Sequence, residues 1–209
     1  TAVRILYGEN QNSQPSVVYQ PAISSRTLTD VEDGVWYFHL QLKNANGWGP
    51  VAHFRFQIDT VKPSDFNIQA SERDPSDPIG RFILTATDAA SGIDHFVIKI
   101  DNGAEQTWAG KSGELYSTSA LSVGTHTLFI KAFDQAGNYL ADSVDLEVKP
   151  LEAPIITDYP ATLLVGDELV VHGRAKPNSQ VMVWLEREGD QAISQTVTSD
   201  ADGNFTLIL

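Results

Sequence analysis

The sequence predicts an all-β chain built from tandem domains, each made of two packed sheets, and three observations lead to this prediction. Runs of alternating apolar and polar residues dominate, bounded by Gly, Pro, Asn and Asp. No window of useful length shows the three- and four-residue apolar spacing of a helix with caps at both ends. A strand–turn–strand pattern also recurs after 90 residues, the separation of Gly34 and Gly124 (124 − 34).

Strands are expected where the alternation is clearest. These are residues 35–42, 52–58, 82–87, 95–101, 125–133, 143–148, 168–172, 181–186 and 205–209. The chain has 209 residues, which exceeds the roughly 100 of one sandwich domain, so two or more domains are expected. With 42% hydrophobic and 20% charged residues, the composition is that of a folded chain.

The repeat covers two strands and the turn that joins them. A period of this size is that of one sandwich domain, because solenoid units have about 20–50 residues. Glycine and asparagine in the turns, at residues 44–47 and 134–138, supply the positive φ that tight turns need. The aligned pairs are Gly34 with Gly124, Gly47 with Gly137, and Ile58 with Val148.

Alternation within the repeat predicts which side chains face the core. One face of each strand is apolar in both copies, as burial against a second sheet requires. His39 and His53 fall on the opposite face and are expected in water. The positions expected inside are Trp36, Phe38, Leu40 and Leu42, their counterparts His126, Leu128, Ile130 and Ala132, and the returning Ala52, Phe54, Phe56 and Ile58.

Proline-containing linkers at residues 58–63 and 148–154 divide the chain into three domains, 1–60, 61–149 and 150–209. Short linkers with proline hold neighbouring domains in a semi-rigid line. If the period holds, the first domain lacks about its first two strands and the third lacks its last two. Either the chain is an excerpt, or strands from elsewhere complete both ends.

Charge and cysteine content exclude several functions. The net charge of −13, from 27 acidic and 14 basic residues, repels nucleic acid and anionic lipid. The absence of cysteine excludes disulfides, Cys-ligated zinc and thiol catalysis, and favours a prokaryotic exported protein. No apolar stretch of about 18 residues is present, so no membrane insertion is expected, and no signal peptide is visible at Thr1.

Several strings resemble known modules. Residues 33–40, 44–50 and 54–60 resemble the last two strands of fibronectin type III-like and bacterial Ig-like modules. Residues 88–94, 123–128 and 132–138 are similar to bacterial Ig-like repeats of large surface proteins, and residues 165–183 and 200–206 resemble the Ig-like units of adhesin stalks. The sequence departs from the fibronectin pattern at one position. Trp36 and His126 stand at the inward position where a fibronectin domain has its corner tyrosine, and Tyr37 is expected to face outward.

The resemblance implies tandem immunoglobulin-like or fibronectin III-like β-sandwiches in an elongated array. Residues 1–60 would form the C-terminal portion of one domain, residues 61–149 a complete bacterial Ig-like domain, and residues 150–209 the N-terminal portion of another. These motifs are specific for fold and carry little information about function.

No catalytic site is expected. The five histidines lie outside nucleophile-elbow, zinc-protease and glycosidase-like motifs. His39 and His53 are expected nearly opposite each other on adjacent strands, where two imidazoles can share a metal ion. The alternative, two solvated polar residues without a third ligand, is favoured.

Calcium is the candidate metal, because carboxylate-rich loops at the junctions of extracellular domains bind it. The chosen ligands are Asp59, Asp88 and Asp134, from a larger set that includes Asp65, Glu72, Asp74, Asp77, Asp94 and Asp101. No EF-hand or repeat-toxin spacing is present. The competing interpretation is that Asp88 and Asp134 cap their own turns while the other acids only solubilise the chain.

Trp48 and Trp108 are the candidate binding residues, because an exposed aromatic ring can stack on a sugar or anchor a partner. Packing within the domain is the favoured alternative for both. We therefore predict a non-catalytic spacer of an extracellular, adhesin-like or surface-anchored prokaryotic protein, whose partners are the neighbouring domains and a surface protein or glycan. One alternative is a carbohydrate- or protein-binding accessory module of a secreted enzyme, in which Tyr37, Trp48 or Trp108 would supply an aromatic row. The other alternative is a subunit of a surface lattice or fibre.

Overall fold

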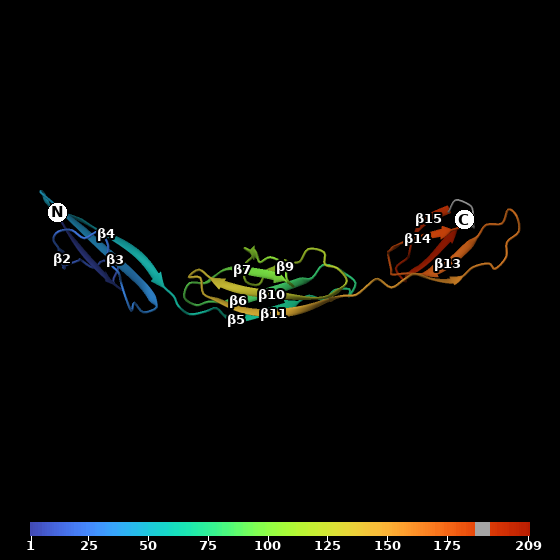
Figure 1. Cartoon of the computed structure of the whole chain (residues 1–209), viewed down its shortest axis with the longest axis horizontal. Helices are drawn as coiled ribbons and strands as arrows, with labels where there is room; N and C mark the ends of the chain where they lie inside the picture. The colour runs from blue at the N-terminus through green and yellow to red at the C-terminus, as the bar shows by residue number, and fades with distance from the viewer. Residues whose placement is uncertain (187–192) are drawn as a thin grey trace. The chain divides into compact units, whose positions relative to one another are not determined.

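The computed structural model describes residues 1–186 and 193–209. The prediction of an all-β chain is confirmed, because these residues form sixteen strands and no helix (Figure 1). The chain divides into two compact units, Thr1–Val148 and Lys149–Leu209. Within each unit, every paired strand is antiparallel to its neighbour.

One four-stranded sheet forms the beginning of the first unit. Its spatial order is β2-β1-β3-β4, so β1 and β3 are the central strands. Ala2 and Val3 are adjacent in β1 and both are buried, which shows that this strand is covered on both faces. The strands are β1 (Ala2–Gly8), β2 (Val18–Tyr19), β3 (Gly34–Asn44) and β4 (Gly47–Ile58).

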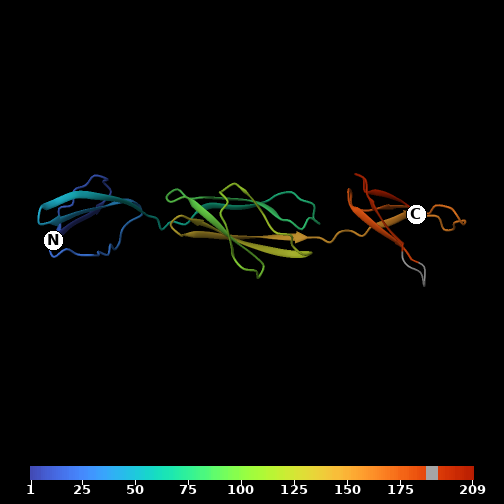
Figure 2. The same cartoon turned by 90° about the horizontal axis from the view of Figure 1, so that it is seen from above.

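Two sheets follow in the same unit and face each other as a sandwich (Figure 2). Phe82, Leu84, Phe96, Leu128 and Ile130 are fully or almost fully buried between them and form the centre of its core. One sheet has the order β11-β10-β7-β8 and the other β5-β6-β9. The strands are β5 (Ser64–Ala70), β6 (Arg81–Thr87), β7 (Ile93–Ile100), β8 (Gln106–Trp108), β9 (Leu115–Ser117), β10 (Gly124–Asp134) and β11 (Tyr139–Val148).

The structure reproduces the 90-residue repeat in its strand boundaries. Strand β10 begins and ends 90 residues after β3, and each begins with a glycine whose φ is positive, +148° at Gly34 and +138° at Gly124. The first residue of each strand pairs with the last residue of the next, Ile58 or Val148. Glycine is required at these two openings because L side chains rarely adopt such φ values.

Four expectations about the first domain are wrong. Leu42, Ala52 and Phe54 were expected inside, yet all three are exposed, Leu42 by 60% and Phe54 by 68%, because no second sheet covers this part of β3 and β4. His39 was expected in water, yet it is fully buried. Strand β3 lies between β1 and β4, so His39 is enclosed between Leu6 and His53 on the neighbouring strands.

The second unit contains a three-stranded and a two-stranded sheet, with the orders β12-β13-β16 and β14-β15. Its buried apolar residues are Val171, Val181, Phe205 and Leu207. The Phe205 ring packs against the backbone at Gly173, where any Cβ would collide with it. The strands are β12 (Ile155–Asp158), β13 (Val170–Arg174), β14 (Gln180–Leu185), β15 (Ile193–Thr198) and β16 (Asn204–Ile208).

Candidate metal-binding site

Three carboxylates that are distant in sequence converge in the first unit. Asp59 follows β4, Asp88 follows β6, and Asp134 is the last residue of β10. One carboxylate oxygen from each lies within 4.8 Å of the others, and among the described residues no other group of three acidic, His or Cys side chains comes so close. Asp59 is 8% exposed and Asp134 is 2% exposed, while Asp88 is half-buried.

Backbone amides hold each carboxylate in place. Asp88 Oδ1 accepts hydrogen bonds from the amides of Gly92 (2.9 Å), Ser91 (2.8 Å) and Ala90 (3.1 Å). These bonds, the one from Gly92 first, lower the pKa of Asp88 because they stabilise its charged form. The carboxylate is therefore ionised at neutral pH.

Asp134 is held by its own turn. Its Oδ1 accepts from the amides of Ala136 and Asn138, both at 2.9 Å, and its Oδ2 accepts from Asn138 Nδ2 at 2.9 Å. The same Asn138 Nδ2 donates to the backbone carbonyl of Asp59 at 3.1 Å. Asn138 thus joins the linker after β4 to the β10–β11 turn.

Two further hydrogen bonds connect the first domain to the loop after β6. Asp59 Oδ2 accepts from the Ser91 amide at 3.1 Å, and Gln57 Nε2 donates to the Ala90 carbonyl at 2.8 Å. Asp88 and Asp134 do cap their own turns, as the competing interpretation held. The same turns also bring both carboxylates to Asp59, so capping and convergence occur together.

The three carboxylates have no cationic side chain beside them. In the part of the chain that the structure describes, none of the ion pairs includes Asp59, Asp88 or Asp134. Like charges at this separation repel, and burial strengthens the repulsion because the local dielectric is low. The arrangement is therefore suited to a hard cation that prefers oxygen ligands.

The third domain provides an internal comparison. Asp200 caps a turn of the same construction, because its Oδ1 accepts from the amides of Asp202 (2.9 Å) and Asn204 (2.8 Å). These bonds, the one from Asn204 first, also lower its pKa. Among the described residues, Asp200 belongs to no group of three close acidic, His or Cys side chains. The turn alone does not create the cluster.

His39 and His53 lie opposite each other, as expected, and their Nδ1 atoms are 2.7 Å apart. The ring centroids are 4.9 Å apart and the rings are nearly perpendicular. The Nε2 atom of His39 is buried and has no hydrogen-bond partner among the described residues. The pair is a hydrogen-bonded one, with no third ligand in the described residues.

The two candidate tryptophans are both packed within their domains. Trp108 is half-buried against the second-domain core, with ring centroids 5.7 Å from Phe96 and 5.5 Å from Tyr116. Burial of the Tyr116 side chain in the same cluster raises its pKa. Trp108 therefore packs against the second-domain core, and a binding role for it stays a prediction.

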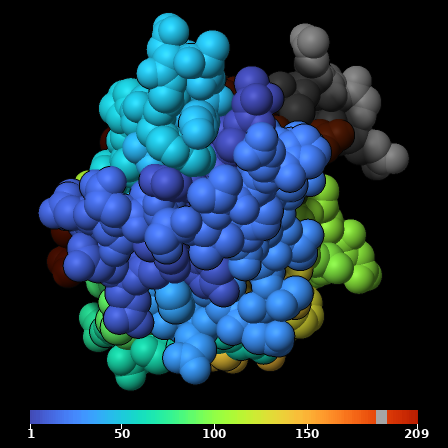
Figure 3. Space-filling view, turned by 90° about the vertical axis from the view of Figure 1, so that its left-hand side faces the viewer, coloured from blue at the N-terminus to red at the C-terminus, as the bar shows by residue number. Residues whose placement is uncertain are grey.

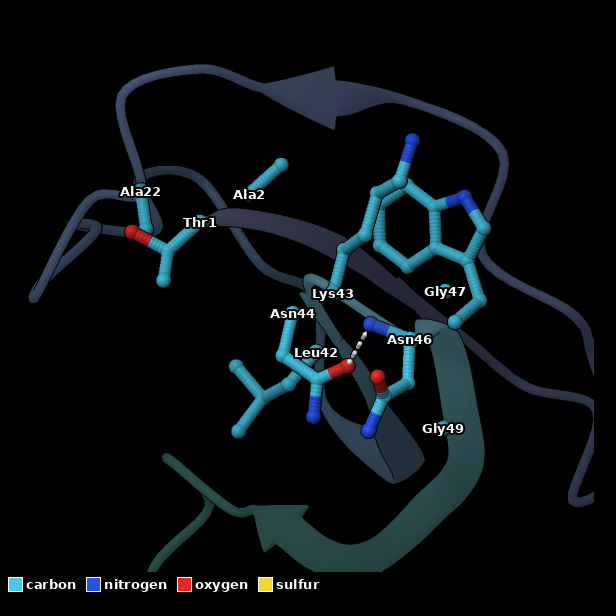
Figure 4. Close-up of a pocket in the computed structure, with 10 residues that line it drawn as sticks. Thr1, Ala2, Ala22, Leu42, Lys43, Asn44, Asn46, Gly47 and Gly49 are labelled. Atoms are coloured by element: carbon cyan, nitrogen blue, oxygen red, sulfur yellow. Dashed lines mark hydrogen bonds between the residues drawn. The ribbon is translucent and has the colours of Figure 1, made fainter.

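Trp48 borders a shallow pocket at the β3–β4 turn (Figure 4). The guanidinium of Arg4 lies 4.0 Å from the centre of its ring, and Lys43 Nζ lies 5.7 Å from it. Tyr37, the third member of the expected aromatic row, is half-buried. The pocket is lined by Thr1, Ala2, Ala22, Leu42, Lys43, Asn44, Asn46, Gly47, Trp48 and Gly49.

No protein-family model matches the sequence, and no curated protein matches it. Among solved structures, the chain is similar to a tetra-tandem repeat in the extending region of a large adhesion protein, with 17% identity and a TM-score of 0.39. That likeness covers 99% of this chain and 57% of the other, so this chain spans little more than half of its length.

Two further solved structures are similar. One is a Ca²⁺-stabilised adhesin with which an Antarctic bacterium binds ice, at 15% identity and a TM-score of 0.30, covering 84% of this chain and 48% of that one. The other is dimeric latent PorU from Porphyromonas gingivalis, at 14% identity and a TM-score of 0.32, covering 100% of this chain and 26% of that one. No ligand, substrate or partner is carried over from these likenesses. Among the described residues, no helix is long and apolar enough to cross a membrane.

Proposed function

We propose that the chain is a non-catalytic spacer segment of an extracellular, adhesin-like prokaryotic protein, and that its partners are the neighbouring domains of the same polypeptide. The observation that carries the proposal is the reuse of one hairpin unit at a spacing of 90 residues, with linkers of only a few residues between the last strand of one domain and the first of the next. Short proline-containing linkers limit the freedom of neighbouring domains, which is what a spacer requires.

The surface charge is compatible with this role. A net charge of −13 keeps tandem domains soluble and apart from one another at high local concentration. The competing proposal of a sugar-binding module relied on Tyr37, Trp48 and Trp108. Arg4 lies against the Trp48 ring, and the Trp108 ring packs against the second-domain core. The spacer is therefore the better supported function.

Small-angle X-ray scattering of the chain tests the spacer. A compact globule of 209 residues has a radius of gyration of about 17 Å, and the unfolded chain about 49 Å. We expect an intermediate value, with the Kratky plot of folded domains and a pair-distance distribution with a long tail. A radius near that of the compact globule would contradict the proposal.

We further propose that Asp59, Asp88 and Asp134 bind Ca²⁺ and so stiffen the linker between the first and second domains. Two of the carboxylates are buried, all three are close together, and none of them is in an ion pair with a described residue. Calcium takes six to eight oxygen ligands in flexible geometry, whereas Mg²⁺ demands a near-ideal octahedron. Three carboxylates supply only part of such a shell, and backbone carbonyls or water would complete it more easily around Ca²⁺ than around Mg²⁺.

The calcium proposal is tested by hydrogen exchange in increasing urea with and without the ion, which reports the free energy of opening for the loops that hold the carboxylates. At 100 times the dissociation constant, one bound ion stabilises the folded state by about 2.7 kcal/mol. We expect Asp88→Asn to abolish this gain, because it removes one charge while the amide oxygen still accepts the backbone hydrogen bonds. Without calcium the same variant should be more stable than the parent, because the repulsion among the carboxylates falls.

Asp200→Asn is the matched control, because Asp200 accepts the same backbone hydrogen bonds but belongs to no cluster of three carboxylates among the described residues. Its response to calcium should equal that of the parent chain. Equal responses of the parent and Asp88→Asn would exclude this site. A parent chain that gains no stability from calcium beyond the effect of sodium chloride at equal ionic strength would also exclude it.

A further inference from the structure

The first-domain sheet matches one of the two sheets of the second domain strand by strand. The order β2-β1-β3-β4 corresponds to β8-β7-β10-β11, and every neighbouring pair is antiparallel in both. Val3 of β1 is opposite Leu42, and Phe96 of β7 is opposite Ala132, which is the repeat counterpart of Leu42. The first domain thus contains one layer of the sandwich that the second domain contains in full.

The two sheets carry apolar side chains on the same face, but only one is covered along its whole width. In the second domain, Leu128, Ile130 and Ala132 are completely buried. At the equivalent positions of the first domain, Phe38 and Leu40 are only half-buried and Leu42 is 60% exposed. We call the apolar surface formed by Phe38, Leu40, Leu42, Phe54 and Phe56 the open face.

The structure shows what covers the equivalent surface in the second domain. Strand β5 packs over β11, and β6 contributes Phe82 and Leu84, which are completely buried. Phe66 of β5 reaches across to Phe96 of β7, with ring centroids 6.3 Å apart. The cover is therefore a second sheet with an apolar residue at every other position, as in Phe82, Leu84 and Ala86.

The first domain has only a partial cover of its own. The Arg26 guanidinium, from the segment between β2 and β3, lies 5.9 Å from the ring centre of Tyr7 on β1. Towards β4 the cover ends, since Phe54 is 68% exposed. Figure 3 shows the first domain from its outer end, where residues coloured blue to cyan form the surface nearest the viewer.

We infer that the open face receives a second antiparallel sheet of the β5–β6 type, supplied in cis by polypeptide that directly precedes β1. Chain order favours this source, because β5 and β6 directly precede β7, the counterpart of β1, and only five residues separate β6 from β7. Supply in cis also gives a high effective concentration. A second copy of this chain is disfavoured because two bodies of charge −13 repel each other.

A graft tests the inference. Because Val3 takes the place of Phe96, Thr1 corresponds to residue 94, so a copy of residues 62–93 is fused directly before Thr1. The sequence has no cysteine, so Phe54→Cys places a single thiol on the open face. We expect this thiol to react with a maleimide at nearly the rate of a free thiol in the ungrafted chain, and at least about tenfold more slowly in the grafted one.

The control graft carries Phe82→Asp and Leu84→Asp in the added copy alone, which keeps its length but removes its apolar face. This control should leave the thiol reactive. The inference is overturned if the thiol is slow to react in the ungrafted chain at every concentration, or if the intact graft gives no protection. Protection that appears in the ungrafted chain only as its concentration rises would assign the cover to a second copy and likewise overturn supply in cis.

Hydrogen exchange of the amides in β3 and β4 provides a second measurement that does not require the cysteine substitution. Exchange of these amides should slow by about tenfold or more with the intact graft and stay unchanged with the control graft. Slowing by both grafts alike would show that added length, and not an apolar face, is responsible, and would contradict the inference.

Discussion

Identical Leu→Ala substitutions at Leu128 and Leu42 measure how much the cover of the sheet contributes to stability. Both residues lie on the same face of repeat-related strands, but Leu128 is completely buried and Leu42 is 60% exposed. At Leu128 the substitution removes buried methyl groups and leaves a cavity between two sheets. Such changes cost about 2.7–5.0 kcal/mol, and we expect about 3 kcal/mol here.

At Leu42 the expected loss is much smaller. Full burial of a leucine is worth about 1.5–3 kcal/mol, and less than half of this side chain is buried, so we expect about 1 kcal/mol or less. No cavity forms, because water already contacts the site.

The assay is hydrogen exchange in increasing urea, which reports the free energy of opening for each domain separately. Bulk unfolding curves are unsuitable because a chain with several domains does not unfold in two states. Losses of equal size at Leu42 and Leu128 would refute the reasoning, because they would mean that Leu42 is covered in solution.

Two further predictions concern the second domain. The hydrogen bond to Asp101 raises the pKa of His126 above 6.5, and the same bond lowers the pKa of Asp101 below 3.8. The pairing of the two side chains should therefore stabilise the domain most between pH 3.8 and pH 6.5. This stabilisation should be lost as the pH rises through the folded-state pKa of His126. An NMR titration midpoint of His126 at or below 6.5 would contradict this expectation. Gly80→Ala should cost about 1–3 kcal/mol, because its Cβ would lie 2.6 Å from Leu146. Gly8→Ala, whose Cβ meets nothing within 4 Å, should cost nothing, and equal losses in the free energy of opening measured by hydrogen exchange for the two variants would refute the packing argument.

Much of the fold follows from local pattern. Alternation located β3, β4, β10 and β11, and the repeat marked where β3 and β10 begin and where β4 and β11 end. The starts of β4 at Gly47 and of β11 at Tyr139 precede the predicted starts at residues 52 and 143. Strands β1, β2, β5, β8, β9, β12 and β15 lie outside the predicted ranges. Two of them, β2 and β8, are very short. With two and three residues, they are defined by the neighbour they pair with and not by a pattern of their own.

Burial was harder to predict than strand position. Alternation shows that Phe54 and Leu128 lie on apolar faces, but whether a second sheet is present over each face is a tertiary property. The buried His39 is a related case, because enclosure between two neighbouring strands outweighs the polarity of its side chain. Its partly unsatisfied ring costs free energy, which sequence alone gives no reason to expect.

The carboxylate cluster shows the same division between local and tertiary information. An asparagine or aspartate accepts backbone hydrogen bonds within three turns. Asn44 accepts from the Asn46 amide and Asp134 from the Asn138 amide in repeat-related hairpins, while Asp200 accepts from the Asn204 amide in the turn between β15 and β16, which belong to different sheets. Among the described residues, two other carboxylates join only Asp134, because β4 ends beside the second domain and the loop after β6 turns back towards it. The turn motif therefore fixes one carboxylate, and the junction of two domains supplies the other two. If this reasoning is correct, calcium affinity depends on the linker at Asp59 as much as on the turn, and Asp59→Asn should weaken binding as strongly as Asp88→Asn does.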